Sequence, residues 1–113
     1  MLKKLEIVIR PEKVSHLKRI LSECHASGAM FSNISGYGNQ KSSQYIFRGK
    51  PYFEEIFSKT KVETVVTEEV AEKLIERILK ELPTGEMGDG KIFIYDVAET
   101  IKIRTGEKGT DAV

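Results

Sequence analysis

The chain has 113 residues, 40% of them hydrophobic, with 18 lysines and arginines against 17 acidic residues and a formal charge of +1. This length indicates one domain with a thin core, and the balanced charge excludes a generic polyanion binder, which needs a clear basic excess. Because Cys24 is the only cysteine, an internal disulfide and a cysteine-ligated zinc site are excluded as well.

No apolar stretch approaches the ~20 residues that a bilayer-spanning helix needs, and the N-terminus shows no signal-peptide core. We therefore expect a cytoplasmic protein that forms a single domain over residues 1–113. Cys24 falls on the apolar side of a predicted helix, so we interpret it as a buried structural thiol.

The first elements are indicated by alternation and by helical spacing. Residues 5–10 alternate apolar with mostly polar side chains, which predicts a strand. Pro11 then opens a predicted helix, where its missing N–H costs nothing, and an apolar face continues to about His25. We expect Gly28 to end this helix and residues 30–37 to form a second strand.

The segment from residue 38 to residue 58 differs from its surroundings. It is polar, contains glycine, serine and proline, and has no sustained periodicity. A stretch of this kind inside a small domain is uncommon and usually has a function. We interpret residues 38–58 as a long protruding loop between the second strand and a third strand at residues 62–66.

The second half of the chain contains another helix and strand. Thr67 is expected to cap a helix that Pro83 ends, and residues 92–97 are expected to form a fourth strand. Apolar and basic residues alternate over 101–104, which indicates a further edge strand. The charged tail 105–113 is expected to be mobile when no ligand is bound.

The predicted order of strand, helix, strand, strand, helix and strand indicates an α+β fold of the ferredoxin-like type, with both helices on one face of an antiparallel sheet. The other face carries alternating apolar residues and has no helix left to cover it. Because a large exposed apolar face is unfavourable in water, we expect the chain to self-associate through it.

A glycine-rich segment, T-G-E-M-G-D-G-K, lies between the second helix and the fourth strand at residues 84–91. Glycines permit positive φ angles, so backbone N–H groups can converge on an anion, and Lys91 adds a positive charge at the edge. The segment is therefore a candidate phosphate-binding loop, and an ordinary glycine-rich turn is the alternative. It is not a P-loop, because Lys91 is not followed by serine or threonine and does not open a helix.

Two further clusters are candidates for completing such a site. Lys102 and Arg104 share one face if the chain is extended there, and the alternative is a solvated edge strand. The stretch from Gly36 to Lys41 lies at the root of the long loop. The Gln40 carbonyl oxygen there suits Mg²⁺, which prefers oxygen ligands, and an ordinary loop base is the alternative.

The sequence offers little for catalysis. His16 and His25 have no partner at metal-ligand spacing and are interpreted as exposed helix histidines, and no nucleophile–base pair can be assigned. We therefore expect a binding protein and not an enzyme. RNA-recognition domains share the strand order, and Phe93 and Tyr95 share a strand face, but the basic aromatic signature of those domains is absent, so no nucleic-acid partner is expected.

Together these motifs resemble the PII signal-transduction family of nitrogen regulators over nearly the whole chain. The resemblance is carried by T-G-x-x-G-D-G-K-I-F at Thr84 to Phe93 and by I-x-I-R-T-G-E at Ile101 to Glu107. The sequences G-Y-G-x-Q-K at Gly36 to Lys41 and R-G at residues 48–49 fall where the family's long loop has them.

The resemblance implies a homotrimer of ferredoxin-like subunits that binds ATP or ADP in the clefts between them. The glycine-rich loop would hold the phosphates, and Lys102 and Arg104 would reach them from across the subunit boundary. The complete set implied for nucleotide binding is Gly36, Tyr37, Gly38, Asn39, Gln40, Glu63, Val65, Thr84, Gly88, Asp89, Gly90, Lys91, Lys102 and Arg104.

The resemblance also implies that 2-oxoglutarate binds together with Mg-ATP. Gln40 would ligate the Mg²⁺ ion, and Gln40, Lys41 and Lys59 would hold the acid, with Lys59 pairing with one of its carboxylates. Arg48 and Tyr52 lie in the long loop, through which family members act on an ammonium transporter or on an enzyme of nitrogen metabolism. Contact with a membrane would thus be indirect.

Several positions depart from the family pattern. Asn39 and Lys102 stand where the family usually has arginine, Glu86 where it often has a cation, and Met30 where it usually has threonine. The substitutions at Asn39 and Glu86 leave an alternative open, an adenine-nucleotide energy sensor that does not respond to 2-oxoglutarate. Gln40 and Lys59 favour binding of the acid.

Overall fold

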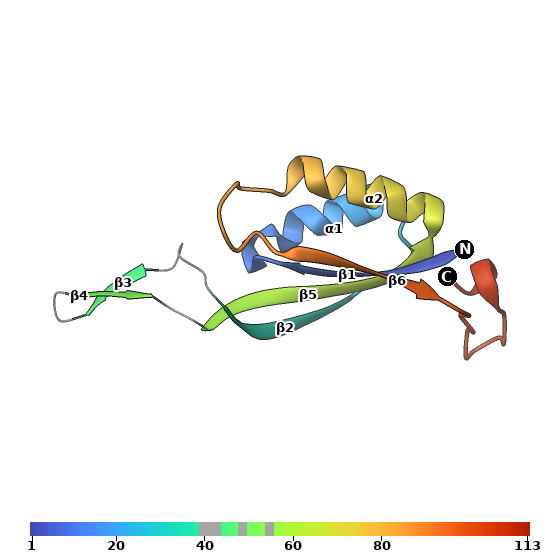
Figure 1. Cartoon of the computed structure of the whole chain (residues 1–113). Helices are drawn as coiled ribbons and strands as arrows, with labels where there is room; N and C mark the ends of the chain where they lie inside the picture. The colour runs from blue at the N-terminus through green and yellow to red at the C-terminus, as the bar shows by residue number, and fades with distance from the viewer. Residues whose placement is uncertain (39–43, 48–49, 54–55) are drawn as a thin grey trace.

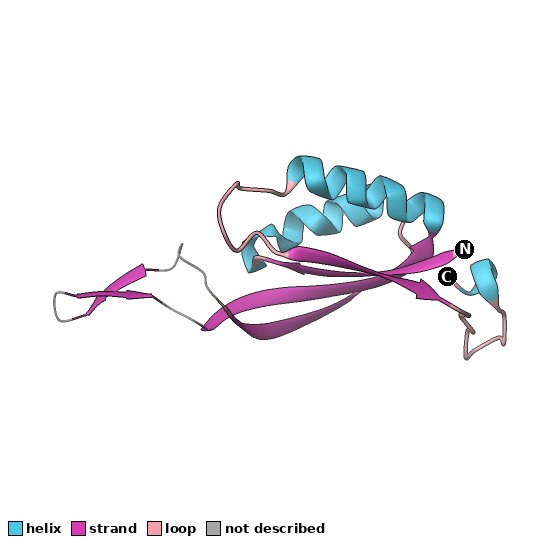
Figure 2. Cartoon of the chain, viewed as in Figure 1, coloured by secondary structure: helices cyan, strands magenta, loops and turns pink. Residues whose placement is uncertain are grey.

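Two helices lie over one face of a four-stranded antiparallel sheet (Figure 1, Figure 2). The computed structural model describes residues 1–38, 44–47, 50–53 and 56–113. In chain order the elements are β1 (Leu2–Ile9), the 3-10 helix η1 (Pro11–Lys13), α1 (Val14–Glu23), β2 (Met30–Tyr37), β3 (Gln44–Phe47), β4 (Lys50–Phe53), β5 (Ile56–Thr67), α2 (Glu68–Glu81), β6 (Lys91–Val97) and the 3-10 helix η2 (Gly109–Ala112).

β1 lies in the interior of the sheet, whose strand order is β2-β5-β1-β6. It pairs antiparallel with β5, where Leu2 lies opposite Thr67, and with β6, where Ile7 lies opposite Ile92. This order of strands and helices is that of the ferredoxin-like fold. The predicted α+β fold is therefore confirmed.

The side of the sheet that faces the helices carries the core. Leu5 and Ile7 of β1 are fully buried, as are Leu17 of α1 and Leu74 of α2. Their spacing follows the period of two in a strand and of three to four in a helix, and burial of one such side chain stabilises by about 1.5–3 kcal/mol. The predicted buried thiol is confirmed, since Cys24 belongs to the same cluster.

α2 begins and ends where the sequence predicts. The Thr67 hydroxyl accepts a hydrogen bond from the Val70 N–H at 3.3 Å, which satisfies one of the unpaired donors of the first turn. The helix ends at Glu81, shortly before Pro83, because proline cannot continue the hydrogen-bond pattern.

α1 ends earlier than predicted. Its last residue is Glu23, and Gly28 takes no part in ending it. His25 instead adopts a positive φ of 64°, and the Ala26 N–H bonds back to the Leu21 carbonyl at 2.9 Å. This is a Schellman motif with histidine at the position that glycine usually occupies, so the prediction based on Gly28 was wrong.

Residues 38–58 contain more secondary structure than the sequence indicates. β3 and β4 form a hairpin, with Gln44 opposite Phe53, that extends away from the four-stranded sheet (Figure 1). β5 begins at Ile56 and not at Val62, because it pairs with the whole length of β2. The predicted start of this strand was therefore wrong.

After β6 the chain turns and does not continue as an edge strand. Residues 103–105 form a turn, which the Gly106 N–H closes by bonding to the Lys102 carbonyl at 2.7 Å. The strand predicted over residues 101–104 was therefore wrong. The chain then folds back through η2, and the mobility expected for this tail stays a prediction.

The face of the sheet opposite the helices is less apolar than predicted. Lys4 pairs there with Glu63 at 2.8 Å, and Lys61 lies 3.7 Å from the same carboxylate. Exposed aromatic side chains alternate with these charges, and Phe93 and Tyr95 of the edge strand β6 are 45% and 47% exposed. An exposed edge strand of this kind is compatible with self-association, which stays a prediction.

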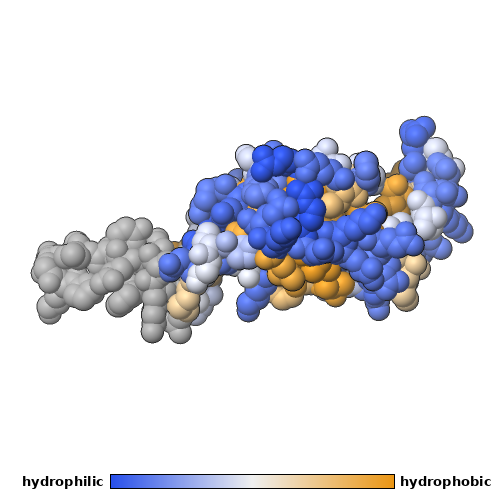
Figure 3. All heavy atoms as spheres, turned by 90° about the horizontal axis from the view of Figure 1, so that it is seen from above, coloured by the Kyte–Doolittle hydropathy of each residue, from blue (hydrophilic) through white to orange (hydrophobic). Residues whose placement is uncertain are grey.

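The view from the helix side shows a different surface. The outer side of the helix layer is mostly hydrophilic, with hydrophobic surface gathered along one edge (Figure 3).

An ion-pair network joins α1 to α2. The Arg77 guanidinium donates to Glu81 through Nε at 2.7 Å and to Glu23 through Nη1 at 2.7 Å, and His16 lies 2.8 Å from Glu81. His16 is thus half-buried and paired, unlike the exposed histidine predicted, whereas His25 is exposed. Hydrogen bonds from Arg77 and then from His16 lower the pKa of Glu81 to about 2.

We expect the substitution Glu81→Gln to flatten the dependence of stability on pH. The pKa of Glu81 is lower in the folded state than its ordinary value of 4.5. The unfolded chain therefore binds more protons between these values, and wild-type stability rises as the pH rises from about 2 to about 5. Chemical unfolding at a series of pH values measures this slope. Glu76→Gln, at an exposed position of α2, should keep the wild-type slope, and a wild-type slope in Glu81→Gln would contradict the role of the network.

Candidate functional site

The connection between α2 and β6 is a curved loop with glycines at its bends. Gly85, Gly88 and Gly90 have φ angles of 86°, 95° and 104°. Positive φ angles turn neighbouring N–H groups toward a common side, which is how backbone nests bind anions. Three residues of the segment 84–91 thus adopt the positive φ angles that backbone nests use, and the phosphate-binding role of the loop stays a prediction.

Gly90 is the point at which this loop meets the sheet. A Cβ atom at Gly90 would lie 1.8 Å from the Val8 carbonyl oxygen and 3.2 Å from the Ile9 Cα. Glycine is required because the opposing atoms belong to the backbone of β1 and cannot rotate away as a side chain can. This contact places the loop directly against the C-terminal end of β1.

Asp89 organises the loop from within. Its carboxylate accepts hydrogen bonds from the Thr84 N–H at 2.9 Å, the Thr84 hydroxyl at 2.5 Å and the Gly85 N–H at 3.0 Å, and from Arg10 Nε at 3.2 Å. These bonds, the Thr84 hydroxyl foremost, lower the pKa of Asp89 to about 2. Asp89 and Thr84 belong to the predicted nucleotide-binding set, and in the structure the Asp89 carboxylate is directed to donors of its own loop and to Arg10.

Lys59 is a buried cation beside this loop. Its residue surface is only 4% exposed, and its ammonium group donates to the Gly88 carbonyl. The ammonium also lies 5.2 Å from the centre of the Phe57 ring. Burial, and then the nearby charge of Arg10, lower the pKa of Lys59. Because its hydrogen-bond acceptor is a neutral carbonyl, an incoming anion would gain a strong interaction with this lysine.

These residues enclose a pocket of about 520 Å³ at one end of the sheet. Phe57 and Phe93 form apolar parts of its wall, and Lys59 and Lys91 supply positive charge. Apolar walls with a few convergent polar groups are typical of ligand sites. The lining residues are Val8, Tyr37, Gly38, Phe57, Lys59, Glu86, Gly88, Asp89, Gly90, Lys91 and Phe93.

The pocket brings together predicted residues from three segments of the chain, namely the end of β2, the N-terminal part of β5 and the glycine-rich loop. Gly36, also predicted, lies beside it, where a Cβ atom would come within 2.3 Å of the Phe57 ring. Val8, Phe57 and Phe93 were not predicted as site residues. Strand alternation could have indicated Phe93, but the position of Phe57 depends on the pairing of β5 with β2.

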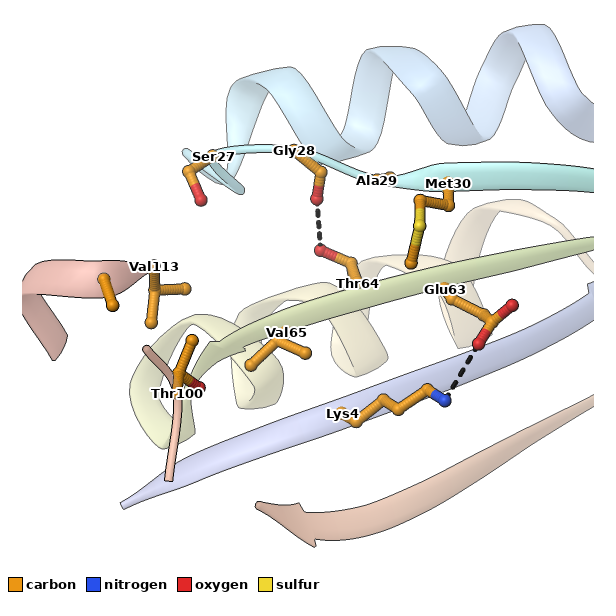
Figure 4. A pocket seen from close by; sticks show the side chains of 11 residues that line it. Lys4, Ser27, Gly28, Ala29, Met30, Glu63, Thr64, Val65, Thr100 and Val113 are labelled. Atoms are coloured by element: carbon orange, nitrogen blue, oxygen red, sulfur yellow. Dashed lines mark hydrogen bonds and ion pairs between the residues drawn. The ribbon is translucent and has the colours of Figure 1, made fainter. Parts of the chain in front are cut away.

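Glu63 and Val65 lie apart from this pocket, in a second pocket of about 360 Å³ (Figure 4). The rise along β5 from Lys59 to Val65 is about 20 Å. Lys4 bonds to Glu63 at 2.8 Å, and this hydrogen bond lowers the pKa of Glu63. The Thr100 hydroxyl also belongs to the wall, where it is buried and has no hydrogen-bond partner among the described residues. Within one chain, the predicted residues 88–91 of the glycine-rich loop line the first pocket, and Glu63 and Val65 line the second.

Lys102 and Arg104 line neither of these pockets. They belong to the turn after β6, in which Arg104 is exposed and Lys102 lies 3.6 Å from Glu107. Within one chain, the structure does not bring these two cations to the glycine-rich loop.

Some predicted positions are not covered by the structure. Asn39, Gln40, Lys41 and Arg48 lie outside the described residues, so their roles stay predictions. Tyr52 lies in β4, opposite Tyr45. Within the described ranges, no three histidine, cysteine, aspartate or glutamate side chains are grouped so that they could hold a metal ion.

Among the described residues, neither helix has the length and apolar composition needed to cross a bilayer.

The fold and the loop define a small α+β protein with a candidate anion site at one end of its sheet. Residues 2–107 match the family model described as nitrogen regulatory protein P-II. A nitrogen regulatory protein P-II from Pasteurella multocida is 40% identical over 112 residues, which cover 99% of this chain and 100% of the relative.

Solved structures agree with this match. B. subtilis GlnK aligns with a TM-score of 0.81 at 38% identity, over 99% of this chain and 98% of the other. The B. subtilis GlnK-ATP complex aligns with a TM-score of 0.79 at 34% identity, over 99% and 97%. Arabidopsis thaliana PII bound to citrate aligns with a TM-score of 0.78 at 31% identity, over 99% and 92%. The chain belongs to the nitrogen regulatory protein P-II family, so the resemblance read from its motifs is confirmed.

We expect Gly90→Ala to lower the free energy of unfolding by more than about 1 kcal/mol. The φ angle of 104° disfavours a residue with a Cβ, and the Val8 carbonyl occupies the space that the Cβ would need. Gly28→Ala is the matched control, because a Cβ there would meet nothing within 4 Å. Urea unfolding of both variants measures the difference, and equal stabilities would contradict the close contact between the loop and β1.

Proposed function

We propose that this protein is a homotrimeric regulator of nitrogen metabolism that binds ATP or ADP in the clefts between its subunits. The pocket of the glycine-rich loop is the observation that carries the proposal. Its backbone nest and the cations Lys59 and Lys91 suit a di- or triphosphate, and its aromatic wall suits a ligand that also has apolar surface. The existence of an ATP complex of B. subtilis GlnK supports a nucleotide as that ligand.

A ring of subunits would complete this site. Glu63 and Val65, which the resemblance places around adenine and ribose, lie in the second pocket, about 20 Å along β5 from Lys59. A head-to-tail contact would bring the second pocket of one copy to the first pocket of the next, and such a contact closes into a ring when the rotation permits. It would also carry Lys102 and Arg104 toward the phosphates of a neighbour.

The second pocket has an independent feature that supports a ligand. A buried hydroxyl without a hydrogen-bond partner costs about 1–3 kcal/mol, and the Thr100 hydroxyl has none within the part of the chain that the structure describes. A polar group of a bound ligand, or a water molecule that the ligand orders, would remove this cost. The same pocket holds the Glu63 carboxylate, an acceptor suited to ribose hydroxyls or an adenine amino group.

2-Oxoglutarate is the proposed effector, bound together with Mg-ATP. The buried ammonium group of Lys59, bonded to a neutral carbonyl, supports a carboxylate partner, and an Arabidopsis PII is known bound to citrate, another polycarboxylate. Mg²⁺ would be held largely by the nucleotide phosphates, with Gln40 as a protein ligand, since this ion usually takes few ligands from a protein.

The second candidate is a sensor of ADP and ATP that does not respond to the acid. Glu86 lines the same pocket as Lys59, and its negative charge would oppose an additional anion there. This observation favours the simpler sensor, whereas Lys59 favours the acid.

Residues 38–58 are the proposed partner-binding segment, through which the bound ligand would affect other proteins. Two residues that line the pocket, Tyr37 and Gly38, lie just before and at the start of this segment. Ligands that bind with different affinity to different conformations of the segment would shift their populations. The proposed partners of this segment are an ammonium transporter or an enzyme of nitrogen metabolism. No catalytic role is assigned to the chain itself.

We expect Lys91→Gln and Arg104→Gln each to weaken ATP binding by about tenfold or more, because each removes a charged partner of the phosphates. Since the proposed site takes these residues from different subunits, trimers that contain both variants should regain intact sites. Such sites form where the subunit with an intact Lys91 meets one with an intact Arg104. Calorimetry on co-assembled and separate variants measures the recovery, and mixtures without recovery would contradict the shared cleft. A wild-type protein that binds neither ATP nor ADP at millimolar concentration would overturn the nucleotide function itself.

We expect Lys59→Met to abolish binding of 2-oxoglutarate to the Mg-ATP-loaded protein, because the acid loses its buried cation while most apolar contacts of the side chain remain. Titration of the acid into the loaded protein measures this directly. Lys61→Met, on the same face of β5, is the control and should bind the acid as the wild type does. If the Mg-ATP-loaded wild type does not bind 2-oxoglutarate, the second candidate, a sensor of ADP and ATP alone, is favoured.

A further inference from the structure

Arg10 lies just after β1, outside every motif that indicates the nucleotide site. From its contacts we infer that Arg10 is a positioning residue, which holds the glycine-rich loop in its phosphate-binding shape before a ligand arrives. The inference rests on the proposed nucleotide site and adds to it a residue that orders the phosphate-binding backbone.

The backbone of Arg10 is constrained on both sides. It precedes Pro11, and the residue before a proline is confined to extended conformations, as its φ of −60° and ψ of 138° show. Its carbonyl accepts a hydrogen bond from the Lys13 N–H at 3.0 Å. The side chain is only 16% exposed, so the guanidinium group extends from a fixed point toward the loop.

The guanidinium group makes two different hydrogen bonds to the loop. Nη2 donates to the Met87 carbonyl at 2.7 Å, and Nε donates to the Asp89 carboxylate at 3.2 Å. The planar fork of arginine can reach a carbonyl and a carboxylate at once, whereas the point charge of a lysine lacks this geometry. The two acceptors flank Gly88, which lines the pocket.

The bond to the Met87 carbonyl determines the direction of a donor in the nest. In a planar trans peptide the carbonyl and the following N–H point in opposite directions, and the described chain has no cis peptide. The bond from Arg10 to Met87 therefore turns the Gly88 N–H away from Arg10. An N–H that is oriented before binding is available to an anion without the cost of ordering the loop.

The bond to Asp89 resolves an electrostatic conflict in the same loop. A carboxylate within an anion-binding loop would repel a phosphate. Arg10, together with the N–H groups of Thr84 and Gly85, holds this carboxylate on the inner side of the loop and compensates its charge. The Gly88 N–H is thus left for a ligand while the negative charge of Asp89 is paired.

Hydrogen exchange of the ligand-free protein tests the inference without any nucleotide. Arg10→Gln should free Asp89, so the Thr84 and Gly85 amides, which bond to its carboxylate, should exchange faster than in the wild type. Arg77→Gln is the matched control, because Arg77 also bridges two acceptors but lies between the helices, and it should leave exchange in the loop unchanged. Wild-type exchange of the loop in Arg10→Gln would overturn the inference.

Calorimetry with AMP, ADP and ATP provides the second test. We expect Arg10→Gln to weaken ATP binding by about tenfold, with a loss that grows from AMP to ADP to ATP, because the loop acts on the phosphates. Arg10→Lys should recover part of the affinity, since it keeps the charge but lacks the fork. An equal loss for all three nucleotides, the result expected of a general destabilisation, would overturn the positioning role. If the wild type binds no nucleotide, the proposed function fails, and the exchange experiment still decides whether Arg10 holds the loop.

Discussion

The close approach of the Gly90 backbone to the Val8 carbonyl is the contact on which the whole site depends. It joins the glycine-rich loop to the end of β1, an interior strand whose position is set by pairing on both edges. Because the loop starts from this fixed support, three side chains can complete its shape. Asp89 closes it from within, and Arg10 and Lys59 hold two successive carbonyls from the side of the sheet.

Charge in this small protein is placed where it can be compensated or used. Contacts of Arg77 with Glu23 and of His16 with Glu81 join the two helices. Lys4 pairs with Glu63 on the opposite face of the sheet. Lys59 differs, because it is buried and bonds to a neutral carbonyl. A buried cation without a negatively charged partner strongly attracts an anion. This property agrees with the position of Lys59, which lines the pocket of the glycine-rich loop.

Features that act over a few residues could be predicted from the sequence. The alternation in β1, the Thr67 cap and the glycine-rich loop all depend on neighbouring residues, and the structure has each of them. Predictions of where elements begin or end failed in two situations. Either another nearby residue ended the helix, or pairing with a distant strand extended the element. His25 ended α1 in place of Gly28, and pairing with β2 moved the start of β5 to Ile56.

The sequence by itself determined the order of the two long helices and the four strands of the main sheet, the loop at residues 84–91 and membership of the P-II family, since contiguous motifs carry all three. Only the tertiary structure decided which distant residues meet this loop. Strand register brings Arg10 and Lys59 to it and leaves Val65 about 20 Å further along β5. Such distances follow from pairing between segments far apart in the chain, which no local pattern of residues encodes.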